Sequence, residues 1–70
     1  MFLVWYDPSP KKPLGVKVAE ACERYTERFG GEPAVCLVNP LDRCEAAGVE
    51  VRERAQVGRH QFWVGHDDPD

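Results

Sequence analysis

The fold is decided by residues 14–29, LGVKVAEACERYTERF. Apolar side chains recur in this segment at intervals of four, four, three and four residues, at Leu14, Val18, Cys22, Tyr25 and Phe29. Such spacing is typical of an amphipathic helix that presents one apolar stripe to a core. Pro13 suits the first turn, and Gly30-Gly31 supplies a left-handed stop. The segment therefore predicts one main helix.

Two uninterrupted apolar runs flank this helix, FLVWY at residues 2–6 and AVCLV at residues 34–38. Each run is ended by an X-Pro pair, and such runs are typical of strands that are covered on both faces. The order strand, helix, strand predicts a parallel crossover that leaves the two strands side by side. Asp7 and Asn39 would then leave the same edge of the sheet.

The second half of the chain predicts a short helical turn and two more strands. Residues 41–47 have room for a helical turn, started by Asp42 and ended by Gly48. Residues 49–57 alternate apolar and charged side chains, and Gly58-Arg59 suits a hairpin turn into residues 60–64. These last two strands are predicted to pair antiparallel.

The predicted fold class is α/β (α+β). It is a small mixed four-stranded sheet in the order β-α-β-(short helical turn)-β-β, with one main helix packed on one face. Residues 1–70 form a single domain, because 70 residues hold only one core, and residues 66–70 are expected to be a flexible tail.

Composition limits the classes of function. A net charge of −3 and a pI of about 5.3 argue against a general polyanion binder. Three cysteines without a C-x-x-C pair indicate reduced thiols and a cytoplasmic location. The first apolar run is too short for a membrane span. Six arginines against three lysines, with no isoleucine, favour a bacterial source with a GC-rich genome.

A single helix covers only one face of the predicted sheet, so the other face needs a cover. If Phe2, Val4 and Tyr6 point toward the helix, Leu3 and Trp5 point away from it, and Trp63 joins them. Three covers are open: residues 41–47, a second copy of the chain, or another macromolecule. We favour the second copy, since two-fold dimers are the commonest assemblies. The predicted function is a small cytosolic interaction or accessory protein that dimerises through Leu3, Trp5 and Trp63.

No catalytic motif is present, which favours a protein without enzymatic activity, and no cofactor is expected. The candidate catalytic residues are Asp7, Asn39 and Asp42, because open α/β sheets bind ligands at the carboxyl ends of their strands. The same residues also end strands and start turns, and this is the interpretation we favour. Cys44 is the candidate reactive thiol, since Cys22 and Cys36 lie in buried patterns.

An alternative function is nucleic-acid binding or metal-dependent phosphoryl processing. It would use Asp7 with a strand surface that carries Arg52, Arg54 and Arg59 beside Trp63. Glu50 and Glu53 in the same segment weaken that basic field. For a metal, the candidate ligands are His66, Asp67 and Asp68, but no second ligand set with fixed spacing accompanies them, so no metal site is predicted.

Overall fold

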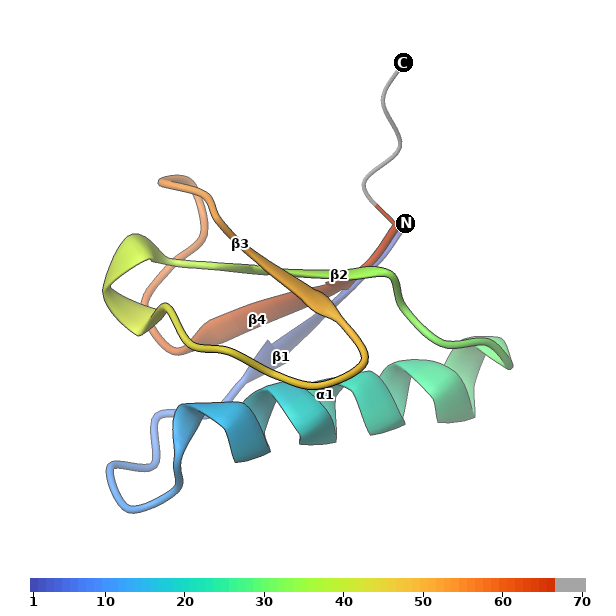
Figure 1. Cartoon of the computed structure of the whole chain (residues 1–70), viewed down its shortest axis with the longest axis horizontal. Helices are drawn as coiled ribbons and strands as arrows, with labels where there is room; N and C mark the ends of the chain where they lie inside the picture. Colours follow the sequence, from blue (N-terminus) through green and yellow to red (C-terminus); the bar gives the residue numbers. More distant parts are fainter. Residues whose placement is uncertain (67–70) are drawn as a thin grey trace.

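In the computed structural model, which describes residues 1–66, one helix packs against one face of a four-stranded mixed sheet (Figure 1). The elements are β1 (Phe2–Tyr6), α1 (Leu14–Phe29), β2 (Val35–Val38), the 3-10 turn η1 (Pro40–Asp42), β3 (Glu50–Glu53) and β4 (Gln61–Gly65). This confirms the predicted fold class, including the short helical turn ahead of the third strand. The predicted flexible tail falls on residues 66–70, of which 67–70 lie outside the described residues.

The main helix has the predicted bounds. Gly30 adopts a left-handed conformation with φ of 81°, and its N–H donates to the Thr26 carbonyl at 2.9 Å. Pro13 precedes the helix without a side-chain cap. The helical residues that are buried are Lys17, Val18, Ala21 and Tyr25. The stripe is therefore rotated from the predicted one, and Phe29 is left 40% exposed.

The strand order is β1-β4-β2-β3, with β4 antiparallel to both of its neighbours and β2 parallel to β3. Two predictions are wrong: β1 and β2 are not adjacent, and β3 does not form a hairpin with β4. The physical reason is the composition of the last two strands. β4 is strongly apolar and occupies the interior of the sheet, whereas the charged side chains of β3 tolerate an edge.

The main core lies between the sheet and α1. Its buried members are Val18, Ala21, Tyr25, Cys36, Val38, Phe62 and Val64. Leu3 and Trp5 of β1 pack against this cluster, and so do Cys44 and Ala46 from the segment before β3. Residues 41–47 thus add to the cover on the helix side of the sheet and do not cover the opposite face.

A smaller cluster lies on the opposite face, which we call the open face. It contains Val35, Leu37 and Val57, with Phe2 and Trp63 packed against them. Val57 belongs to the turn between β3 and β4 and is fully buried, so this turn covers part of the open face. The chain itself therefore supplies a cover that the sequence analysis did not consider.

Candidate functional site

Asp7 follows β1 and is engaged within its own loop. Its Oδ1 accepts a hydrogen bond from the Ser9 N–H at 3.0 Å, and its Oδ2 lies 3.1 Å from Lys12 Nζ. Lys12 also donates to Glu20 at 2.9 Å. The hydrogen bond from Ser9, aided by Lys12 and opposed by desolvation, lowers the pKa of Asp7. The carboxylate thus ties the proline-rich loop to α1.

Asp42 lies in η1 and is only 3% exposed. Its Oδ2 accepts a hydrogen bond from the His60 N–H at 2.8 Å, and Arg59 Nη2 lies 3.2 Å from Oδ1. Burial alone would raise the pKa of Asp42, but the His60 N–H and the Arg59 guanidinium outweigh it and lower the pKa. His60 has a φ of 65°, a left-handed conformation that is rare for a non-glycine residue. Asp42 therefore holds a strained turn in place.

Asn39 is the N-cap of η1. Its side chain accepts from the Leu41 N–H at 2.9 Å and donates to the Val57 carbonyl at 2.8 Å. The cap of the short turn is thus Asn39, whereas the sequence analysis assigned it to Asp42. Asp7 and Asn39 do leave the same end of the sheet, because β1 and β2 both run antiparallel to β4, but β4 lies between them. Within residues 1–66, no hydrogen bond or ion pair joins the side chains of the three candidate catalytic residues to one another.

The three arginines of the alternative function are each engaged by a neighbouring group. Arg52 Nε lies 2.8 Å from Glu50, Arg54 donates to the Glu53 carbonyl at 2.9 Å, and Arg59 pairs with Asp42. Arg52 faces the same side of the sheet as Trp63, one on each side of Leu37. Because β3 and β4 are not paired, the arginines do not form the hairpin surface on which the alternative was built.

Of the three candidate metal ligands, only His66 lies within the described residues. His66 is exposed, and its ring contacts Tyr25 edge-on with 6.2 Å between centroids. Asp67 and Asp68 lie outside the described residues. Among residues 1–66, no group of three or more His, Cys, Asp or Glu side chains has the geometry to hold a metal ion.

All three cysteines are free, and none is activated. Burial raises the pKa of Cys36 to about 12 and also raises the pKa of Cys22 and Cys44. Desolvation, with the nearby Asp42 carboxylate as a smaller cause, therefore makes Cys44 a poor nucleophile. This raised pKa does not support the hypothesis that Cys44 is a reactive thiol.

We expect Cys36 to react with a thiol reagent at pH 8 at least about 100-fold more slowly than an exposed cysteine, because the thiolate is the reactive form. Timed alkylation followed by peptide mass spectrometry measures each site, and the same reaction in guanidinium is the control. Alkylation of Cys36 in the folded chain as fast as in guanidinium would contradict this prediction.

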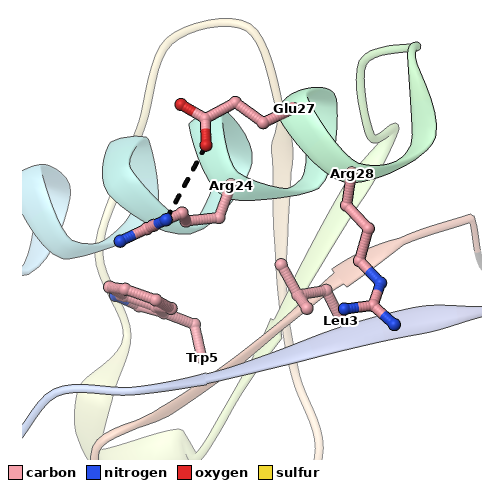
Figure 2. A pocket seen from close by; sticks show the side chains of 5 residues that line it. All are labelled: Leu3, Trp5, Arg24, Glu27 and Arg28. Carbon is pink, nitrogen blue, oxygen red and sulfur yellow. Dashed lines mark ion pairs between the residues drawn. The ribbon is translucent and has the colours of Figure 1, made fainter.

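The two tryptophans lie on opposite faces of the sheet. Trp5 points to the helix side, where the Arg24 guanidinium lies 5.4 Å from its ring centroid (Figure 2). Arg24 also pairs with Glu27 at 3.7 Å. Leu3 and Trp5 are therefore not on the face that carries Trp63, and the prediction that these three residues share one face is wrong. The reason is that the alternation of β1 has the opposite phase to the one assumed.

Phe2, Val4 and Tyr6 of β1, together with Trp63 of β4, form an apolar strip on the open face that we call the β1 strip. The register places Val4 opposite Trp63. Val4 is 50% exposed and Tyr6 is 61% exposed, whereas Leu37 on the other side of Trp63 is only 5% exposed. The uncovered apolar surface of this face is thus concentrated at β1.

β1 is also an edge of the sheet, and its outer backbone groups can be assigned. The Asp7 N–H donates to the His60 carbonyl at 3.0 Å and so continues the ladder between β1 and β4. Hydrogen-bonded and non-hydrogen-bonded pairs alternate along an antiparallel ladder. The residues whose N–H and C=O groups point to the free edge are therefore Phe2, Val4 and Tyr6.

The position of β1 at an edge of the sheet was not predicted from the sequence. The charges of residues 50–53 are a usable signal that β3 forms one edge. No comparable signal identifies β1 as the other edge, because all five of its residues are apolar or aromatic.

Comparison of the chain with models of protein families, with curated proteins and with solved structures found no match. Within residues 1–66, no helix has the length and hydropathy that a membrane span requires.

Proposed function

We propose that this protein is a small cytosolic interaction protein that forms a homodimer through the β1 strip. The observation that carries the proposal is the exposure of Val4 and Tyr6 on an edge strand, at 50% and 61%. Exposed apolar surface beside unpaired backbone groups favours association with another chain.

The two edges of the sheet differ in the way that this proposal requires. At the β3 edge, Glu50 pairs with Arg52 and Glu53 lies 3.3 Å from Arg43, so charged side chains line the strand. Natural sheets use such charges to prevent edge-to-edge pairing. β1 has the sequence FLVWY and no such protection. This contrast supports β1 as the side that is covered by a partner.

The cytosolic location is supported by three free cysteines, one of which is fully buried in the main core. A bacterial source stays a proposal that rests on composition. No enzymatic activity is proposed, because Asp7, Asn39 and Asp42 are each engaged in local contacts that shape the loops around them. The alternative with Arg52, Arg54 and Arg59 gains no support from the geometry described above.

Light scattering after size exclusion tests the proposal. We expect the wild-type chain of 7.9 kDa to run at roughly twice that mass at high micromolar concentration. Tyr6→Lys places a charge in the β1 strip and should give a monomer at the same concentration.

Leu41→Lys is the matched control, because Leu41 is 74% exposed in η1, which follows β2, and lies outside the β1 strip. It should leave the dimer intact, and circular dichroism should show that both variants are folded. A wild-type chain that stays monomeric at millimolar concentration would remove the proposed function.

A further inference from the structure

The free edge of β1 is self-complementary, and this feature suggests what occupies it. The groups that point outward belong to every second residue, Phe2, Val4 and Tyr6, and Val4 is the midpoint of the strand. An antiparallel copy centred on Val4 brings each outward residue opposite another outward residue. All the outward N–H and C=O groups of both strands can then pair.

Resting on the proposed dimer, we infer that two copies join edge to edge, with β1 antiparallel to β1 of the second copy and Val4 opposite its own counterpart. The two sheets then form one continuous sheet of eight strands. In this register Phe2 lies opposite Tyr6 of the second copy, and Leu3 lies opposite its Trp5. Pairs between aromatic or apolar residues across strands are the favourable kind.

Packing of the two open faces against each other fits the structure less well. The β2 end of the open face is covered by the chain's own turn, in which Val57 is fully buried. The β3 half carries the ion pair between Glu50 and Arg52. Only the half of the face near β1 is apolar and exposed, so a face-to-face sandwich has little surface to bury.

The flank of α1 above β1 is complementary in charge when two copies run antiparallel. An open hollow of about 310 Å³ between α1 and β1 is lined by Leu3, Trp5, Arg24, Glu27 and Arg28 (Figure 2). An adjoining hollow adds Lys12, Glu20 and Glu23.

Carboxylates and guanidinium groups therefore both occur along this flank, with Glu20 and Glu23 before Arg24, and Glu27 before Arg28. In the edge-paired dimer both helices lie on the same face of the sheet and run in opposite directions. Acidic groups of one flank can then reach basic groups of the other, and the arrangement closes by a two-fold axis.

Amide hydrogen exchange followed by NMR tests the register in the wild-type protein. The N–H groups of Leu3 and Trp5 bond to β4 in either state and should exchange slowly. The N–H groups of Val4 and Tyr6 should become at least about 10-fold slower to exchange as the concentration rises through the dimerisation range. A dimer in which Val4 and Tyr6 exchange as fast as exposed amides would overturn the edge pairing and leave the proposed dimer standing.

A side-chain contact between Phe2 and Tyr6 gives a second, independent measurement. Within one chain the two residues are four positions apart on a strand, about 13 Å along its axis, so their rings cannot touch. In the inferred register each ring meets the other residue of the second copy. A nuclear Overhauser effect between the two rings in mixed labelled and unlabelled chains supports the register, and its absence in a proven dimer overturns it.

Val4→Pro removes one outward N–H from each copy, and β4 does not use that N–H. We expect the variant to fold and its Kd for dimerisation to rise about 30-fold or more, since two hydrogen bonds are lost. Val4→Ala is the control for the lost side chain and should have the smaller effect. A folded Val4→Pro variant with wild-type Kd would contradict the inference, and if the variant does not fold, the two wild-type measurements decide. A monomeric wild type removes both proposals.

Discussion

Asp42→Ala is expected to lower the free energy of unfolding by about 2 to 3 kcal/mol. The carboxylate is 3% exposed and receives the His60 N–H at 2.8 Å and the Arg59 side chain at 3.2 Å. Its removal leaves a backbone donor without a partner beside a residue held at a positive φ of 65°. Arg59 is half exposed and can be hydrated, so most of the loss comes from the His60 contact. Urea unfolding monitored by tryptophan fluorescence measures it.

Asp42→Asn separates charge from hydrogen bonding, because its side-chain oxygen can still accept from His60. Its loss should be smaller than that of Asp42→Ala. The pKa of Asp42 is lowered from 3.8 in the folded state, so its charge stabilises the fold above pH 3.8 and this stabilisation disappears as the pH falls through the lowered value. The difference between wild type and Asp42→Asn should therefore shrink between pH 5 and pH 2. A difference that grows on acidification would contradict the assignment.

The sequence predicted the elements of this fold because each leaves a local signal. The period of residues 14–29 and the left-handed stop at Gly30 give the bounds of α1, and the apolar runs give β1 and β2. Strand order carries no such local signal. β4 lies between β1 and β2, where Phe62 and Val64 pack beneath the helix. The position of β4 therefore depends on contacts between residues that are distant in the sequence.

The exposed apolar surface of the sheet was predicted only in part, for a related reason. Counting apolar strand positions correctly indicated more apolar surface than one helix covers. It did not reveal that Trp5 faces the helix, because a run of five apolar residues has no polar side to fix its phase. Nor did it reveal that the turn carrying Val57 covers Leu37 and Val35. The exposed remainder is therefore smaller than the sequence implied and lies at the edge strand.

Phe62→Ala is expected to have the largest effect of any substitution proposed for this chain. Phe62 is the largest fully buried side chain and lies in the core between β4 and α1. Truncation of a buried phenylalanine costs about 3 to 5 kcal/mol, through lost burial and the cavity left behind. At about 0.05 to 0.15 kcal/mol per residue, the whole chain has about 3.5 to 10 kcal/mol of stability. The substitution therefore removes about a third or more of this stability, and we expect a much lower midpoint of thermal unfolding, measured by the α1 signal in circular dichroism.

Phe29→Ala provides the matched control, because Phe29 is 40% exposed at the end of α1. Within residues 1–66, its ring has aromatic and cation–π contacts with Tyr25 and Arg28 only. Phe29→Ala should cost about 1 kcal/mol or less, since most surface substitutions do. The proposed dimer would couple to this measurement, because a partner that binds only the folded chain stabilises it by mass action. The unfolding midpoint of Phe62→Ala should therefore rise with its concentration. Equal losses for Phe62→Ala and Phe29→Ala would mean that the core does not lie where β4 meets the helix.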